Sequence, residues 1–160
     1  MSGAVRDPVD DVDRIMEVMA HAFPPEYGEA WNRRQVADSL ILGGTRYYLI
    51  GPDGSFELAQ DQQTAGFALT RGLFDEEELL LFAVAPEFRK MRLGTALLTH
   101  VIANAKARGV RRIFLEMRKD NPAGKLYAEF GFQTVGVRPG YYRLADGKRL
   151  DALSQALLID

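Results

Sequence analysis

The stretch VAPEFRKMRLGTALLTHVIANAKARG, from Val84 to Gly109, constrains the fold more than any other part of this sequence. The apolar run that ends at Val84 predicts a strand covered on both faces, and a proline stops it. After a short loop, the stripe formed by Leu97, Leu98 and Val101 predicts a long amphipathic helix that ends at Gly109. A second apolar run, RRIFLEMR at 111–118, predicts another strand. Strand, helix and strand in this order predict a crossover between two parallel neighbours.

The segments on either side of this crossover predict further helices and strands, which together give an α+β fold with a mixed sheet. The first helix falls in DPVDDVDRIMEVMAHAF, with Asp7 as its N-cap and Pro8 at the first helical position. A second helix, which carries Val36, ends at Gly43 and Gly44. The remaining predicted elements are a hairpin of strands at 45–51 and 56–60, strands at 64–71 and 76–86, a short helix at 123–130, and final strands at 132–144 and 150–159.

Composition excludes several classes of function. The chain has 160 residues, which predicts one domain spanning 1–160, and its net charge of −2 is not typical of proteins that bind nucleic acid non-specifically. It has no cysteine, and its two histidines, His21 and His100, have no partner at metal-ligand spacing. No apolar segment resembles a signal peptide or is long enough to span a membrane. We therefore expect no metal, no nucleic acid, no membrane contact and a cytoplasmic location.

Three cations, Arg89, Lys90 and Arg92, lie in the loop that leads into the long helix. A helix N-terminus leaves its first backbone N–H groups unpaired and carries about half a positive charge, so a basic loop in front of it favours phosphate binding. The loop fits neither GxxxxGK[ST] nor GxGxxG, the two common nucleotide-binding patterns. A solvated basic turn is the alternative interpretation of these residues.

The segment VAPEFRKMRLGTALL resembles the pyrophosphate loop of the GNAT N-acetyltransferases, whose pattern is Arg/Gln-x-x-Gly-x-Gly/Ala. Arg89 holds the first position and Gly94 the last, whereas Arg92 replaces the middle glycine. If that position needs a positive φ, arginine there costs about 1–2 kcal/mol; the alternative is a loop with right-handed geometry. The order of elements is also similar to this family, which implies a mixed, mostly antiparallel sheet with a central parallel strand–helix–strand crossover and helices on both faces.

This resemblance implies acetyl-CoA as the co-substrate, with direct transfer of its acetyl group to an amine. The implied contacts are the backbone of Phe82, Ala83 and Val84, the loop and helix start formed by Arg89, Lys90, Met91, Arg92, Leu93, Gly94 and Thr95, and the side chain of Asn121. The strand contacts apply if that strand parts from its parallel neighbour, because the extended pantetheine arm can then add to the free edge. Asn121 lies one residue closer to Tyr127 than in the relatives, so we expect a deletion near Pro122, and Asp120 is an alternative contact.

The segments IFLEMRKDN and KLYAEFGF, together with AHAFP and GYYRLADGKRLDALSQAL, resemble more narrowly the bacterial ribosomal-protein-alanine N-acetyltransferases. This resemblance implies Glu116 as the general base and Tyr127 as the general acid that protonates the leaving thiolate. The residues alone leave other interpretations open. Glu116 can be a strand-end carboxylate that points to solvent or pairs with Arg118, in a strand that its apolar neighbours predict to be largely buried. Tyr127 can be an aromatic residue packed by the glycine cap at Gly131.

The acceptor that the resemblance implies is the N-terminal α-amine of a ribosomal protein, with Tyr141 and Tyr142 lining a groove for the peptide. An α-amine with a pKa of about 7.7–8.0 is roughly 10–15% neutral at pH 7, whereas a lysine amine near 10.4 is almost fully charged. A single carboxylate is therefore sufficient for an α-amine acceptor. Two alternatives for the function stay open: an acceptor that is a small amine or a lysine side chain, and a non-catalytic module that binds acyl-CoA. The protein can be a monomer or a homodimer. We expect the acidic run at 75–78 to be a solvated hairpin, or to attract a basic substrate.

Overall fold

The computed structural model describes residues 8–160, and the expected N-cap at Asp7 lies outside them. The helices are α1 (Pro8–Ala22), α2 (Arg33–Ile41), α3 (Leu93–Ala107) and α4 (Gly124–Glu129), with short 3-10 turns η1 (Pro25–Tyr27) and η2 (Pro86–Phe88). The strands are β1 (Thr45–Ile50), β2 (Gly66–Leu73), β3 (Glu76–Val84), β4 (Arg112–Arg118), β5 (Gln133–Arg143) and β6 (Arg149–Leu158). The predicted second helix begins at a capping box, in which Asn32 and Gln35 exchange hydrogen bonds between side chain and backbone.

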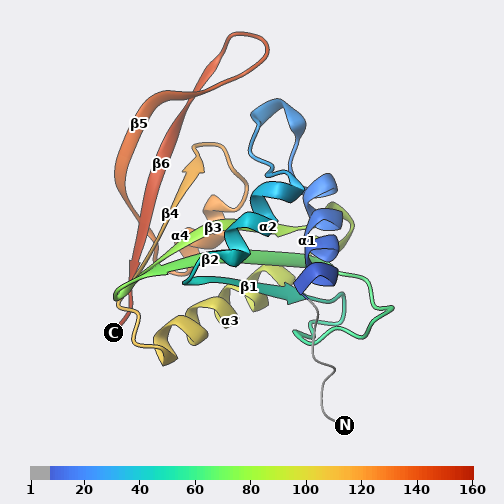
Figure 1. Ribbon diagram of the computed structural model, residues 1–160. Coiled ribbons are helices and arrows are strands. Elements are labelled where there is room, and N and C mark those ends of the chain that lie inside the picture. The colour runs from blue at the N-terminus through green and yellow to red at the C-terminus, as the bar shows by residue number, and fades with distance from the viewer. Residues whose placement is uncertain (1–7) are drawn as a thin grey trace.

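The strands form one six-stranded sheet in the order β1-β2-β3-β4-β6-β5. Only β3 and β4 pair in parallel, and the other neighbours are antiparallel. Helix α3 connects β3 to β4 and covers one face of the sheet, while α1 and α2 lie on the opposite face (Figure 1). The predicted α+β fold with a central parallel crossover and helices on both faces is therefore confirmed.

Strand β3 supplies side chains to two hydrophobic clusters, one on each face of the sheet. Leu79 and Phe82 pack in the cluster built around α3, whereas Leu80 and Leu81 pack in the cluster built around α1. Two consecutive leucines face the same side because the register with β2 shifts at this point, between Leu69 and Thr70 on the partner strand. This irregularity and the two clusters account for the unbroken apolar run from Leu79 to Val84 within β3.

The parallel pair is short, and its two strands then separate. Only Glu76, Glu77 and Glu78 of β3 pair with β4, at Arg112, Ile113 and Phe114. Beyond that point β4 continues to pair with β6 as far as Arg118, so the edge of β3 from Leu79 to Val84 has no strand on this side among the described residues. The condition set for the expected strand contacts is therefore met, because these two strands separate and open a wedge next to the start of α3.

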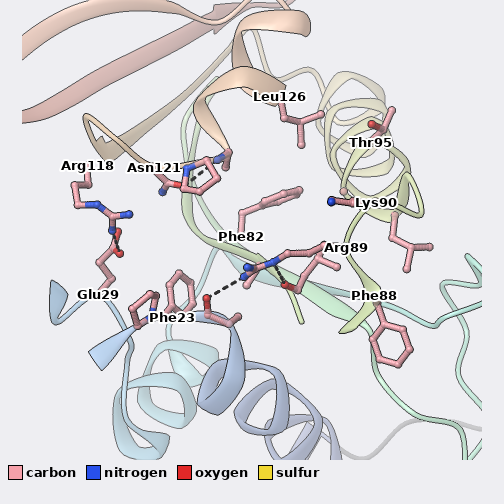
Figure 2. A pocket seen from close by; sticks show the side chains of 18 of the residues that line it. Phe23, Glu29, Phe82, Phe88, Arg89, Lys90, Thr95, Arg118, Asn121 and Leu126 are labelled. Carbon is pink, nitrogen blue, oxygen red and sulfur yellow. Dashed lines mark hydrogen bonds and ion pairs between the residues drawn. The ribbon is translucent and has the colours of Figure 1, made fainter. Parts of the chain in front are cut away.

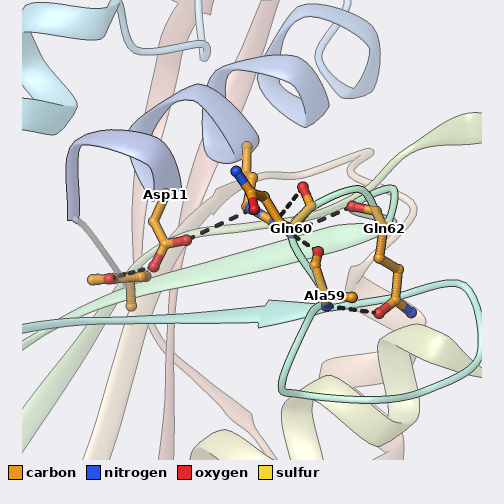
Figure 3. A network of polar contacts seen from close by, with 6 residues as sticks. Asp11, Ala59, Gln60 and Gln62 are labelled. Atoms are coloured by element: carbon orange, nitrogen blue, oxygen red, sulfur yellow. Dashed lines mark hydrogen bonds and ion pairs between the residues drawn. The ribbon is translucent and has the colours of Figure 1, made fainter. Parts of the chain in front are cut away.

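One predicted strand, at 56–60, is wrong. Residues 51–65 form a loop without a strand, and β1 pairs directly with β2. Arg14 of α1 fastens this loop, because its guanidinium donates hydrogen bonds to the carbonyl oxygens of Ala59, Gln60 and Gln62 (Figure 3). Backbone groups that a strand would pair with a neighbouring strand are thus satisfied in part by one side chain from a distant helix.

The expectation of a solvated hairpin at 75–78 holds only in part, because exposed Asp75 lies in the turn between β2 and β3 whereas Glu77 is not solvated. Glu77 is fully buried, and both of its carboxylate oxygens accept hydrogen bonds from Arg108 at 2.9 Å. The hydroxyl of Thr70 donates a further bond at 3.1 Å. The flanking Glu76 and Glu78 form ion pairs with arginines on neighbouring strands. These carboxylates hold the sheet together at the end opposite to the wedge, which makes them poor candidates for attracting a substrate.

Candidate functional site

A cleft of about 670 Å³ lies in the wedge, between the end of β3, the start of α3, the segment after α1 and the loop before α4 (Figure 2). We call it the donor cleft. The predicted contact residues that line it are Phe82, Ala83, Val84, Arg89, Lys90, Arg92, Leu93, Gly94, Thr95 and Asn121. Met91, which was predicted with them, does not line the cleft and is half exposed. The structure therefore brings together nearly the whole predicted set around one cavity.

The loop that precedes α3 has left-handed geometry at two cations. Lys90 has φ of 67° and Arg92 has φ of 61°, a region that non-glycine residues rarely adopt. Arg92 is the N-cap residue of α3, and its side chain makes no capping hydrogen bond. Among the described residues, the first amides of α3 therefore have no side-chain acceptor, and the residues that carry them, Leu93, Gly94 and Thr95, line the cleft. Strained backbone of this kind is often found at ligand-binding sites, where the fold maintains it.

The three cations of this loop differ in what they bind. The guanidinium of Arg89 donates to the carbonyl oxygens of Val84 and Ala22, each at 3.1 Å, and so ties the loop to β3 and to the end of α1 (Figure 2). Within residues 8–160, the side chains of Lys90 and Arg92 form no ion pair with the protein. Since carbonyl oxygens do not neutralise the guanidinium of Arg89, all three cations and the helix N-terminus contribute positive charge to the cleft.

We expect Arg92→Gly to raise the free energy of unfolding by up to about 1 kcal/mol, because glycine adopts a positive φ without steric penalty. The same change should weaken the binding of phosphate-bearing ligands to the cleft, since it removes a cation. Arg92→Ala is the matched control, because it removes the charge and keeps the strain. Urea denaturation and calorimetry measure both properties, and equal stability of the two variants would show that the strain is negligible.

A second cavity, of about 300 Å³, lies next to the donor cleft and is lined by the predicted Glu116, Tyr127, Tyr141 and Tyr142. We call it the acceptor pocket. The rings of Tyr141 and Tyr142 contact edge to face, with centroids 5.2 Å apart. Phe23, Glu29, Phe82 and Asn121 line both cavities. The two cavities are therefore neighbours that share part of their walls.

Glu116 does not lie in a buried position. Its side chain keeps 30% of its surface exposed, and its carboxylate lies 3.4 Å from the Nε of Arg138 on β5. The pairing with Arg118 that the sequence left open is wrong, because Arg118 bonds elsewhere. The expectation of a largely buried strand holds for Ile113, Leu115 and Met117 but not for Glu116, whose side chain points into the acceptor pocket instead.

Tyr127 lies on the buried side of α4. Its ring contacts Phe82 and Phe132, and Phe132 folds back onto the helix after Gly131, whose φ is 96°. The predicted glycine cap is therefore present. Burial raises the pKa of the Tyr127 hydroxyl well above its usual range, and the negative charge of Glu29 raises it further. The raised pKa keeps the hydroxyl protonated, and among residues 8–160 it has no hydrogen-bond partner, so it is free to donate a bond to a ligand in the acceptor pocket.

Asn121 belongs to the loop that leads into α4. Its side-chain oxygen accepts a hydrogen bond from the amide of Ala123 at 2.9 Å and so holds the turn before the helix. Asp120, the alternative, accepts a bond from Arg118. Helix α4 starts only at Gly124, so the loop before it can accommodate the shorter spacing between Asn121 and Tyr127 without any change to the helix.

The sequence did not point to a polar cluster at the junction of the two cavities. Arg118 is 5% exposed, stacks on the ring of Tyr27 with its guanidinium 3.5 Å from the ring centroid, and donates hydrogen bonds to Glu29 and Asp120. Burial raises the pKa of Glu29 from its usual value, and Arg118 partly offsets this rise. The only sequence signal was a cation at the end of an apolar strand, together with an acidic residue shortly after two prolines.

The described residues contain no group of histidine, aspartate and glutamate side chains that could hold a metal ion. In the same range, no helix is long and apolar enough to cross a membrane.

Comparison with known proteins agrees with this geometry. Residues 12–132 match the Acetyltransferase (GNAT) family. The chain is 37% identical over 145 residues to the [ribosomal protein bS18]-alanine N-acetyltransferase of Escherichia coli strain K12, which covers 90% of this chain and 87% of that protein. The corresponding enzyme of Haemophilus influenzae is 30% identical over 148 residues, which covers 91% of each chain.

Solved structures give the same result. The crystal structure of the ribosomal-protein-S18-alanine N-acetyltransferase from Escherichia coli matches with a TM-score of 0.76 and 29% identity, covering 99% of this chain and 92% of that one. Arabidopsis thaliana NAA60 in complex with a bisubstrate analogue matches with a TM-score of 0.72 at 18% identity, covering 99% of this chain and 98% of that one, which shows a similar fold.

Proposed function

The chain belongs to the acetyltransferase (GNAT) family and is an N-acetyltransferase, and we propose that its acceptor is the N-terminal α-amine of a ribosomal protein. The observation that carries this proposal is the similarity to ribosomal-protein-alanine N-acetyltransferases over 90% of the chain. The matching crystal structure of the Escherichia coli enzyme covers 99% of this chain and so includes β5, the strand that supplies Tyr141 and Tyr142 to the acceptor pocket. An acceptor on the ribosome also implies a cytoplasmic location for this protein.

Enzymes of this family use acetyl-CoA, and the donor cleft fits its chemistry. Its phosphates need cations and free amides, which Lys90, Arg92 and the start of α3 supply. Its pantetheine arm is an extended chain with amide groups, which can pair with the free edge of β3 from Phe82 to Val84. Bound there, acetyl-CoA supplies an activated thioester whose carbonyl carbon an amine can attack.

Two side chains of the acceptor pocket are suited to the proton transfers that the reaction needs. In our proposal Glu116 takes a proton from the acceptor ammonium, directly or through water, and the neutral amine attacks the thioester carbon. Tyr127 then gives its proton to the departing sulfur. Burial supports this second role, because it keeps the Tyr127 hydroxyl protonated. Since the two cavities are neighbours and the chain has no cysteine nucleophile, we propose direct transfer with both substrates bound.

An acetylation screen of N-terminal peptides, read by mass spectrometry, tests the acceptor. The panel contains peptides that begin with alanine and with other residues, peptides with a blocked N-terminus and one internal lysine, and small primary amines. Our proposal expects acetylation at the α-amine of alanine-terminated peptides. Turnover restricted to lysine side chains or to small amines would replace the proposed acceptor with one of those classes.

Tyr127→Phe should lower kcat while leaving the affinity for acetyl-CoA nearly unchanged, because it removes only a proton donor used in the transition state and keeps the buried ring. We expect a loss of roughly 10²–10⁴-fold in kcat, the usual contribution of general acid catalysis. Steady-state kinetics and calorimetry measure the two quantities. If the affinity for acetyl-CoA fell together with kcat, Tyr127 would be a packing residue.

A further inference from the structure

Glu29 lies at the junction of the donor cleft and the acceptor pocket. Four side chains line both cavities, namely Phe23, Glu29, Phe82 and Asn121, and Glu29 is the one ionisable residue among them. Its side chain keeps 14% of its surface exposed. A partly buried carboxylate therefore lies in the wall shared by the two cavities, close to where an amine in one would approach a thioester in the other.

The environment of Glu29 fixes one of its oxygens and leaves the other available. Arg118 donates a hydrogen bond to Oε1 (Figure 2), while its guanidinium is held in place by the ring of Tyr27 and the carboxylate of Asp120. No group within residues 8–160 donates a hydrogen bond to Oε2 of Glu29. The ion pair of Arg118 and Glu29 thus leaves Oε2 of Glu29 as an oriented hydrogen-bond acceptor at the junction. In these partly buried surroundings a charge-assisted hydrogen bond is stronger than in water.

We infer that Glu29 binds the ammonium group of the acceptor at this junction, and that this contact lets the enzyme distinguish an amine substrate from its acetylated product. The inference rests on an amine acceptor, which the family implies, and not on the identity of that acceptor. Most amines enter in the charged form at pH 7, and acetylation converts them into neutral amides. The product therefore loses the charge that Glu29 holds and leaves the pocket more readily, while Glu116 remains the proposed base.

The charges around Glu29 give this contact a defined pH dependence. Burial and Asp120 raise the pKa of Glu29, whereas Arg118 lowers it, with a net rise. The other ionisable groups lining the same pocket are Glu116, Tyr127, Tyr141 and Tyr142. The charge of Glu29 raises the pKa of Tyr127 and Tyr142, so its field extends across the pocket. Because only the ionised carboxylate holds an ammonium, acceptor affinity should fall as the pH drops through a value above the ordinary 4.5.

The experiment compares the wild-type enzyme with Glu29→Gln, and with Glu57→Gln as a matched control on the exposed loop at 51–65. The probes are an alanine-terminated peptide, a peptide with one internal lysine, and the acetylated form of each, with affinities measured by calorimetry. We expect the wild-type enzyme to bind free amines more tightly than acetylated forms. Glu29→Gln should lose about 10- to 100-fold of this preference, with a matching rise in the acceptor KM and a much smaller change in kcat.

Other outcomes would overturn the inference. A Glu29→Gln enzyme that keeps the full preference for the free amine shows that Glu29 does not bind the ammonium. Glu29→Asp retains the charge, so a loss of thermal stability in both variants with an unchanged preference assigns Glu29 a structural role. The same data distinguish a failure of this inference from a failure of the proposal that the acceptor is an α-amine. Turnover of the lysine peptide alone would overturn the α-amine proposal and leave the role of Glu29 intact.

Discussion

Glu116→Gln is expected to lower turnover by roughly 10²–10⁴-fold, because a general base contributes about this much and glutamine cannot accept the proton. The change preserves the shape of the side chain, and Glu116 does not line the donor cleft, so the affinity for acetyl-CoA should stay the same. A loss near the lower end is expected for an α-amine acceptor, since a tenth or so of it is already neutral at pH 7. A loss near the upper end would indicate a lysine acceptor.

The pH dependence of this variant provides an independent check. Raising the pH increases the neutral fraction of the amine, so it should partly rescue Glu116→Gln and have less effect on the wild-type enzyme. Glu129→Gln is the control, because Glu129 is exposed on α4 and forms no ion pair with residues 8–160. Near-normal turnover of Glu116→Gln between pH 6 and 9 would show that Glu116 is not the general base and that it only pairs with Arg138 at the surface.

Glu77→Gln is expected to lower the free energy of unfolding by about 3 kcal/mol, because it leaves the charge of Arg108 without its buried partner. Glu77 is fully buried, while the side chain of Arg108 keeps 24% of its surface exposed and can recover some hydration. Glu78→Gln, on the same strand, is the matched control. Its partner Arg71 is about half exposed, and a surface pair of this kind contributes less than about 1 kcal/mol.

Urea denaturation measures both variants, and acetyl-CoA affinity reports whether the donor cleft is intact. The double variant Glu77→Leu with Arg108→Leu should be more stable than Glu77→Gln, because replacing a buried pair by apolar side chains is often nearly neutral. Equal stability of Glu77→Gln and the wild-type protein would mean that Thr70 and the hydrogen bonds of Arg108 are sufficient without the charge.

The parts of this structure that the sequence predicted depend on local periodicity. The crossover through α3 could be predicted because the apolar residues of α3 recur at helical spacing between two apolar strands. Most residues of the donor cleft could be predicted because they belong to the loop before α3 and to the start of this helix. The strand wrongly predicted at 56–60 had suitable apolar residues, but the tether from Arg14 is 45 residues away in the chain from Ala59. No local pattern reports such a contact.

Long-range contacts also determine which polar side chains of the site pair with one another. Arg118 is only two residues beyond Glu116, which made a pairing between them a reasonable expectation. Its partners are instead the nearby Asp120 and Glu29, which is 89 residues away. The burial of Glu77 could not be predicted for the same reason. An acidic run is normally solvated, and the arginine that pairs with Glu77 lies at the far end of α3. A charge becomes buried only where the fold provides its counter-charge, and this pairing is not visible in either segment alone.

The hairpin of β5 and β6 extends beyond the rest of the sheet (Figure 1), and the match to the shared family ends at residue 132, just before β5 begins. The hairpin contributes Tyr141 and Tyr142 to the acceptor pocket, whereas the donor cleft is built entirely from earlier segments. Since most residues of β5 are exposed, we expect substitutions at its exposed positions to change the free energy of unfolding by only a few tenths of a kcal/mol. If the hairpin binds the acceptor as we propose, such substitutions can change the acceptor without changing the cleft that is proposed to hold the acetyl donor.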